Sequence, residues 1–242
     1  MNANSAAHNP RFEPIERRAR FIHMELWNLR AELWGTEELD PLDALEPGVA
    51  LKLKGFRIET VSSLGEMISG GKPVQVAGLI DRKQQVVRIA SSRFSAVEQR
   101  FTAAHELAHA ILHPNGELLH RDRPADILRW QKDPEEREAD FFAACFLMPE
   151  KQVRLWFRRL FLTDQFALND DTAFALCTKP LDVVLPRFRS LRDLSLALAR
   201  TISYNSRQFK SLAELFRVSP TAMAYRLEEL ELVVNPRAVR RA

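Results

Sequence analysis

Several features that mark special protein classes are scarce in this sequence. Its 242 residues include 2 cysteines, 8 glycines and 2 tyrosines. Cys145 and Cys177 lie far apart among apolar neighbours, which excludes a disulfide framework and a cysteine metal site and predicts buried thiols. So few glycines leave no long flexible linker. No apolar run approaches the roughly 18 to 20 residues of a membrane helix, so a transmembrane span is excluded.

Neither sign of charge dominates. Lysine and arginine total 35 against 32 aspartates and glutamates, for a net charge of +3. This near balance gives weak support for a nucleic-acid partner. With 46% hydrophobic and 28% charged residues, the composition is that of a globular protein with a buried core. Residues 1–21 lack the apolar segment of a secretory signal, so we expect a cytoplasmic protein with no membrane partner.

Strand character is concentrated before residue 91. Three segments rich in β-branched or apolar residues are bounded by turn residues: 55–61, 74–80 and 86–90. The last two flank a polar turn and predict a β-hairpin. Apolar residues at helical intervals predict an amphipathic helix over 14–35. Beyond residue 150 the chain is predicted to be helical, with a break at 168–186.

Two more helices are predicted around a polar connection at 115–132. Ser95 and Glu98 have the spacing of a capping box and open the first helix, which ends before Pro114. Asp133 precedes a proline, so it is the predicted N-cap of the second helix.

The segment His105-Glu106-Leu107-Ala108-His109 fits the HExxH pattern inside the first of these helices. Two histidines four residues apart lie about 40° apart on one helix face, so both imidazoles can bind one ion. Zinc suits this set, because two imidazoles and a carboxylate leave a fourth position for water. The ion lowers the pKa of that water, and Glu106 can accept its proton. The pattern indicates a metallopeptidase, although the same pentapeptide also occurs in helices without a metal.

The third ligand has to come from elsewhere. The metzincin spacing requires a histidine six residues after His109, where this chain has Asn115, so that class is excluded. His113 lies a further turn along the helix, and three ligands in one line exceed the reach of one ion. Glu136 and Asp140 are better placed, because they are four apart and share one edge of the second helix.

These two residues suit different roles. Glu136 can reach the metal, while Asp140 accepts a ring N–H from one of the histidines and so fixes its tautomer. Glu136 also lies at the N3 position, where glutamate is favoured in any helix. Glu135 borders the same stripe and remains an alternative ligand, whereas Glu138 is expected on the opposite edge.

Two blocks of the sequence resemble the ImmA/IrrE family of bacterial zinc metallopeptidases. One comprises residues 100–109 and continues to Leu112-His113; the other comprises residues 136–144 and runs into Leu147-Met148-Pro149. Two separated motifs in the right order are more specific than HExxH alone. Residues 209–233 also look like the C-terminal helical segment of the family.

The resemblance implies a site as well as a fold. Zinc would be held by His105, His109 and Glu136, with Glu106 as the general base and a transcriptional repressor as the substrate. Asp140 replaces an asparagine of the family and keeps a hydrogen-bond acceptor, which suits a partner for a ligand histidine.

The expected fold class is α+β. Residues 1–150 would form a zincin-like metallopeptidase domain with a small antiparallel sheet plus active-site helices. Residues 151–242 would form an all-helical C-terminal region containing a helix-turn-helix-like segment at about 209–233. In that segment Arg217 stands where the tight turn usually has glycine.

Direct DNA binding by the C-terminal region is not favoured. The would-be recognition helix, Thr221–Glu231, carries Arg226 against three glutamates, which is a poor fit to a groove lined by phosphates. A packed helical pair that helps to build the substrate site is the preferred interpretation. The acidic helix is also expected to complement the basic surface of a repressor.

The sequence thus predicts a cytosolic zinc-dependent metalloendopeptidase that cleaves a specific protein, a helix-turn-helix repressor, and so derepresses genes. Two alternatives remain open: a zinc-containing DNA-binding transcriptional regulator and a non-catalytic repressor-binding protein. The strand at 86–90 can pair with an extended substrate segment. Candidates for stabilising the oxyanion are Tyr204, Tyr225, His113 and His120, and nothing in the sequence ranks them.

Overall fold

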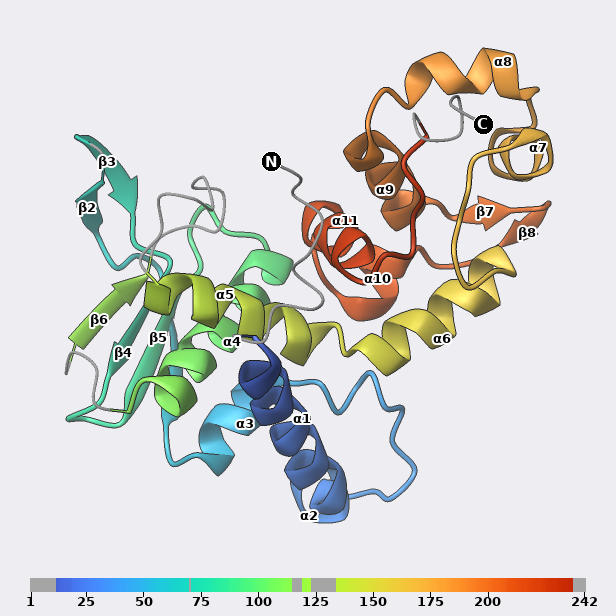
Figure 1. Cartoon of the computed structure of the whole chain (residues 1–242). Coiled ribbons are helices and arrows are strands. Elements are labelled where there is room, and N and C mark those ends of the chain that lie inside the picture. Colours follow the sequence, from blue (N-terminus) through green and yellow to red (C-terminus); the bar gives the residue numbers. More distant parts are fainter. Residues whose placement is uncertain (1–11, 70, 115–118, 123–133, 237–242) are drawn as a thin grey trace. The chain divides into compact units, whose positions relative to one another are not determined.

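The computed structural model describes residues 12–69, 71–114, 119–122 and 134–236. The chain divides into two compact units, one spanning Pro10–Leu147 and the other beginning at Met148. Five strands follow one another in residues 57–90, and most helices lie before or after them, which confirms the predicted α+β class (Figure 1). In the described part of the chain, every helix is too short or too polar to serve as a bilayer span.

The N-terminal unit combines helices with a four-stranded sheet. Its helices are α1 (Glu13–Asn28), α2 (Arg30–Trp34), α3 (Pro47–Leu53), α4 (Ala96–Leu112) and α5 (Pro134–Leu147). Its strands are β1 (Arg57–Val61), β2 (Glu66–Ser69), β3 (Lys72–Gln75), β4 (Gly78–Asp81), β5 (Val86–Ala90) and β6 (Leu119–Asp122). The helix expected to follow Asp133 is present, but Asp133 itself lies outside the described residues.

The sheet has the strand order β1-β5-β4-β6 and is mixed, not wholly antiparallel as expected. β4 pairs antiparallel with β5, which confirms the predicted hairpin, while β1 pairs parallel with β5. β5 therefore has a neighbour on each side, and its backbone groups are already used by the sheet. The expectation that it pairs with an extended substrate is wrong, and within the described sheet the edges are β1 and β6.

Two sequence-based boundaries are also corrected in this region. The predicted strand 74–80 is two strands, because β3 pairs with β2 in a separate ribbon and β4 joins the main sheet. Alternating hydrophobicity cannot distinguish these two pairing partners. The predicted connection 115–132 contains β6, which pairs with β4.

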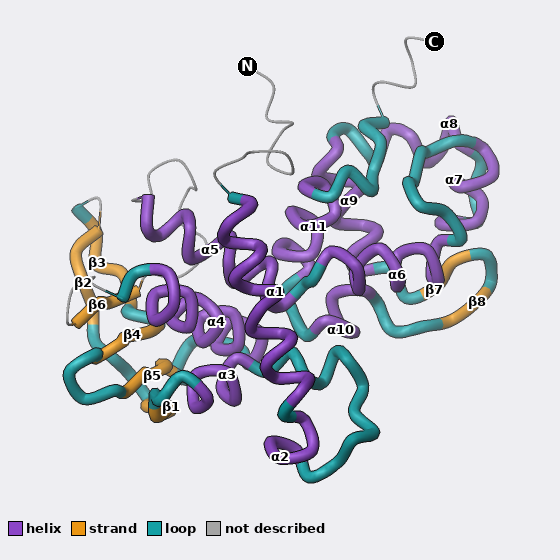
Figure 2. The backbone as a smooth tube through the Cα atoms, turned by 60° about the horizontal axis from the view of Figure 1, so that its bottom comes forward, coloured by secondary structure: helices purple, strands orange, loops and turns teal. Residues whose placement is uncertain are grey.

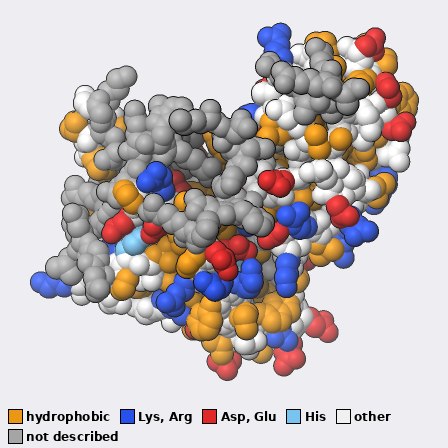
Figure 3. All heavy atoms as spheres, in the orientation of Figure 1, with side chains coloured by type: hydrophobic (Ala, Val, Ile, Leu, Met, Phe, Trp, Pro, Cys, Tyr) orange, Lys and Arg blue, Asp and Glu red, His pale blue; other side chains and the backbone are white. Residues whose placement is uncertain are grey.

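The predicted helix 14–35 is interrupted at Leu29. Its early apolar positions are buried as expected, but the Arg30 guanidinium donates to the Trp27 carbonyl, an acceptor that a continuous helix would use itself. The outer face of α1 keeps Phe21, Met24 and Trp27 in contact with solvent. Figure 3 shows hydrophobic side chains at the visible surface over α1 and α2.

α4 and α5 pack side by side in the core of this unit (Figure 2). Alanines allow their backbones to approach closely: Ala104 and Ala108 on α4 and Ala139 and Ala143 on α5 are all fully buried. The opposite face of α4 packs against β4 and β5. The HExxH helix is thus held between the sheet and α5.

The C-terminal unit is mainly helical. Its helices are α6 (Glu150–Phe161), α7 (Asp170–Cys177), α8 (Leu181–Val184), the 3₁₀ turn η2 (Leu185–Arg187), α9 (Leu191–Arg200), α10 (Leu212–Phe216) and α11 (Pro220–Glu229). A short ribbon, β7 (Ser203–Tyr204) with β8 (Arg207–Gln208), departs from the all-helical expectation. The predicted break at 168–186 contains α7 and α8. Cys145 is buried as predicted, whereas Cys177 at the end of α7 is only partly buried.

The helix-turn-helix-like segment consists of α10 and α11. Arg217 between them has φ +52°, the left-handed conformation that the tight turn requires at this position. On α11, Arg226 is 3% exposed and donates to the Met148 carbonyl and to Glu229. Glu228 pairs with Arg192 of α9. Two of the glutamates expected to face a basic partner are therefore committed to contacts inside this unit.

Candidate metal centre

The motif histidines occupy the most buried part of α4. The helix begins with the predicted capping box, in which Ser95 and Glu98 each satisfy a backbone N–H of the other. About two to three turns after Glu98, His105, Glu106 and His109 have exposures of 1%, 0% and 1%. Burying three such polar groups is costly unless they bind a partner, so this part of α4 is under a requirement other than stability.

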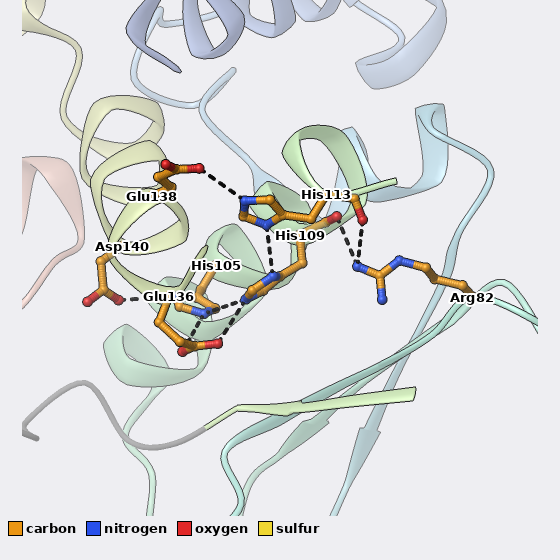
Figure 4. Close-up of polar contacts among 7 residues, drawn as sticks. All are labelled: Arg82, His105, His109, His113, Glu136, Glu138 and Asp140. Carbon is orange, nitrogen blue, oxygen red and sulfur yellow. Dashed lines mark hydrogen bonds and ion pairs between the residues drawn. The ribbon is translucent and has the colours of Figure 1, made fainter. Parts of the chain in front are cut away.

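Glu136 of α5 joins the two histidines (Figure 4). The Nε2 atoms of His105 and His109 are 3.0 Å apart. His105 Nε2 lies 3.5 Å from Glu136 Oε2, and His109 Nε2 lies 3.3 Å from Glu136 Oε1. A tetrahedral ion with bonds of about 2.0 to 2.1 Å spaces its ligands about 3.3 to 3.4 Å apart. The three side chains therefore fit one metal ion of this size.

Asp140 lies one turn beyond Glu136 and contacts the other side of His105. Its Oδ1 is 3.1 Å from His105 Nδ1. A carboxylate accepts a hydrogen bond, so His105 carries its proton on Nδ1 and presents the Nε2 lone pair to the cluster. The structure thus brings Asp140 into the contact that its helical spacing indicated.

His113 and Glu138 extend the cluster in the other direction. His113 Nδ1 is 3.2 Å from His109 Nδ1, and His113 Nε2 is 3.2 Å from Glu138 Oε2. Glu138 was expected on the far edge of α5, away from the site. That edge instead faces the C-terminal end of α4, where His113 follows the last helical residue.

A second group of possible ligands shares His109. It comprises His109, His113 and Glu135, with ligand atoms within 4.8 Å of one another. The guanidinium of Arg82 acts electrostatically on Glu135 and Glu106, and its Nη2 donates to the carbonyls of His109 and His113. Burial lowers the pKa of Arg82, and both carboxylates oppose that change. A cation next to this second group makes it less suitable for a metal than the first.

Glu106 lies against strand β4. A Cβ atom added to Gly78 would collide with the Glu106 carboxylate and would come within 2.6 Å of the Thr102 methyl group. Glycine is therefore required at this position so that the carboxylate can lie over the strand. The sequence analysis missed this role, although a glycine inside a strand is a signal of close approach. Arg82, a turn residue, gave no comparable signal.

The oxyanion candidates separate into different parts of the molecule. His113 contacts His109 on the ring edge away from Glu136, and its second nitrogen faces Glu138, so it does not point into the cluster. The side chain of His120 lies outside the described residues. Tyr204 and Tyr225 belong to the C-terminal unit. Burial and, to a lesser degree, Asp171 raise the pKa of Tyr204.

Residues 61–166 match the peptidase family described as "IrrE N-terminal-like domain". The match supports membership of this part of the chain in the ImmA/IrrE family. The match extends from the end of β1 to a position just beyond α6, and it includes every residue of the cluster. It confirms the resemblance noted in the two motif blocks and assigns a peptidase domain to them. No curated protein matches the chain.

The C-terminal unit contains a hollow of its own. It measures about 580 Å³, and Phe161, Phe174 and Tyr204 contribute to its lining. Phe174 is 61% exposed at this hollow. Since the family match ends at residue 166, most of the lining comes from a part of the chain that the family does not describe.

Proposed function

We propose that this protein is a zinc-dependent metalloendopeptidase whose metal is held by His105, His109 and Glu136. The observation that carries the proposal is the convergence of three side chains inside a peptidase-family domain. The Nε2 atoms of His105 and His109 are 3.0 Å apart, and they lie 3.5 and 3.3 Å from Glu136 Oε2 and Oε1, respectively. Two imidazoles and one carboxylate are a donor set that suits zinc and leaves a coordination position open. A zinc ion bound there would supply Lewis acidity, which polarises a carbonyl and makes water more acidic.

The remaining residues have separate roles in the proposed reaction. Glu106 takes a proton from the attacking water and delivers it to the leaving amine, because its carboxylate is adjacent to both ligand histidines on α4. Asp140 holds the His105 ring through Nδ1 and so keeps its Nε2 lone pair directed at the cluster. Arg82 provides a positive charge near Glu106, which favours the carboxylate form that a base requires.

The proposed substrate is a helix-turn-helix transcriptional repressor, and its cleavage would derepress genes. Support comes from the ImmA/IrrE resemblance of both motif blocks. The burial of Arg226 further supports substrate cleavage over direct DNA reading, because the single arginine of α11 is unavailable to phosphates. An extended substrate would have to pair at an edge of the sheet, since β5 is interior.

Metal analysis of matched variants tests the proposed ligands. We expect about one zinc per chain, loss of zinc in His105→Ala and His109→Ala, and strong weakening in Glu136→Ala. Glu135→Ala is the matched control, because it removes the neighbouring carboxylate of α5. If Glu135→Ala loses zinc while Glu136→Ala retains it, the ligand assignment is wrong.

The substrate is tested with purified components. The zinc-loaded protein is mixed with any helix-turn-helix repressor that a neighbouring gene is found to encode, and cleavage is followed by mass spectrometry, with Glu106→Gln as the inactive control. A gel-shift assay of each protein on the local promoter is run in parallel. We expect a single cut in the repressor. An intact repressor, together with specific promoter binding by this protein alone, would instead identify a DNA-binding regulator.

A further inference from the structure

The two proposed ligand histidines contact different partners through their Nδ1 atoms. His105 contacts the carboxylate of Asp140 directly through Nδ1. His109 contacts another histidine, His113, through Nδ1, and His113 in turn contacts the carboxylate of Glu138. Both rings are thus connected to a carboxylate of α5, one directly and the other through an intervening imidazole (Figure 4).

We infer that His113 and Glu138 are positioning residues that set the tautomer and orientation of His109 for the metal. This inference rests on the proposed metal site. It gives roles to two residues outside the ligand set, and it accounts for a histidine that lies one turn beyond HExxH and contacts His109 on the edge away from Glu136.

The Glu138 carboxylate determines the direction of the hydrogen bonds that link it through His113 to His109. The Glu138 carboxylate accepts, so His113 carries a proton on Nε2. A neutral His113 then has its lone pair on Nδ1 and accepts a proton from His109 Nδ1. His109 consequently keeps the Nε2 lone pair for the metal, which is the state that Asp140 gives to His105.

The burial of the three residues supports this arrangement. The side chains of His109, His113 and Glu138 are 1%, 8% and 26% exposed, so the contacts become more solvent-accessible from the metal site outward. Water competes little for the bond between the two imidazoles. The ring planes of His109 and His113 are tilted by 50° with centroids 5.2 Å apart, so the rings meet through their nitrogens and are not stacked.

Zinc affinity measured by competition with a chelator tests the inference without using peptidase activity. His113→Ala removes the acceptor for His109 and should weaken zinc binding about 10-fold to 100-fold, the range for partners of metal-bound histidines. His113→Asn places its side-chain oxygen near the former Nδ1 position and should restore affinity to within about threefold of the wild type. His23→Ala, which removes a partly buried histidine of α1 bonded to the Phe146 carbonyl, is the matched control and should leave affinity unchanged.

A double-mutant cycle shows whether Glu138 acts through His113. Glu138→Leu alone should weaken zinc binding about tenfold, whereas in the His113→Asn background it should have no further effect, because asparagine does not reach Glu138. The visible spectrum of the cobalt-substituted proteins should change in His113→Ala and return to the wild-type form in His113→Asn.

Three outcomes would overturn the inference. Unchanged zinc affinity in His113→Ala would show that His109 needs no positioning, while the proposed peptidase would stand. Two metal ions per chain, reduced to one in Glu135→Gln, would make His113 a ligand of a second site. A wild-type protein that binds no zinc would remove the proposed function and this inference together.

Discussion

The charged side chain buried on α11 and the polar cluster buried on α4 and α5 have opposite kinds of surroundings. On α11, Arg226 is enclosed by the Met148 carbonyl and the Glu229 carboxylate, so a donor meets two acceptors. On α4 and α5, two imidazole nitrogens and a carboxylate turn toward a common point. The buried arginine and its two acceptors stabilise one another. The imidazole nitrogens and the carboxylate that converge on one point require a cation between them. Complementary partners indicate a structural role, and converging acceptors indicate a binding site.

The largest effect is expected for Glu106→Gln. The substitution removes the proton acceptor and leaves the imidazoles untouched, so hydrolysis should fall about 10²-fold to 10⁴-fold. Zinc content should stay at the wild-type level, which metal analysis of the same sample checks. Near-normal cleavage by this variant would falsify the assignment of Glu106 as the base.

For Arg226→Ala we expect a loss of stability and no change in the metal site. Removing Arg226 leaves the Glu229 carboxylate, 9% exposed, without its buried partner, so stability should fall by about 3 to 5 kcal/mol. Zinc binding should be unaffected. Chemical denaturation followed by fluorescence measures the loss, with Arg192→Ala as the milder control, because the Arg192–Glu228 pair is more exposed and should contribute about 1 kcal/mol or less. Equal losses in the two variants would contradict the proposed role of burial.

A partly buried histidine sharpens the contrast, because His23 has a complementary partner. Its Nε2 donates to the Phe146 carbonyl at 2.9 Å. Burial lowers the pKa of His23 from 6.5 to about 4, despite that hydrogen bond, and Arg20 lowers it further. The unfolded chain then binds a proton more readily than the folded one, so stability is complete above pH 6.5 and is lost as the pH falls toward about 4.

The loss of folding stability as the pH falls from 6.5 to about 4 should reach about 3 kcal/mol. Thermal unfolding of the wild type and of His23→Gln between pH 4 and 7 measures it. Glutamine can donate to the same carbonyl but does not titrate, so the variant should lose much less stability in acid. Identical acid profiles would show that another group controls this transition.

The smallest effect is expected for Gly78→Ala. The added methyl group meets the Glu106 carboxylate and Thr102, so Glu106 has to move. Hydrolysis should fall about tenfold to a hundredfold while zinc binding persists. Gly48→Ala is the matched control, because a Cβ there meets nothing closer than 3.6 Å and should be tolerated. Full activity in Gly78→Ala would show that β4 does not fix the position of Glu106.

The features that the sequence predicted well depend on local spacing. The capping box at Ser95 and Glu98, the two histidines of α4 and the left-handed turn at Arg217 all follow from residues within a few positions of one another. The placement of Asp140 followed from its helical spacing to Glu136. Such patterns can be recognised without knowing the rest of the fold.

The features that were missed depend on contacts between distant segments. The predicted hairpin gives β5 one neighbour, and the parallel pairing with β1, which a strand pattern does not encode, makes β5 an interior strand. The contact of Glu138 with His113 requires the relative placement of α4 and α5. Gly78 matters only because Glu106 of another element lies over it. In each case the contact that the sequence did not predict joins residues 25 or more positions apart in the chain.

Zinc K-edge X-ray absorption of the purified protein tests the metal site most directly. The account predicts one zinc per chain with nitrogen and oxygen ligands at about 2.0 to 2.1 Å, a scattering pattern typical of two imidazoles, and no sulfur ligand. The bound zinc should be lost in His109→Ala. A sulfur ligand at about 2.3 Å, or a zinc environment unchanged in that variant, would contradict the central claim that His105, His109 and Glu136 form the metal site.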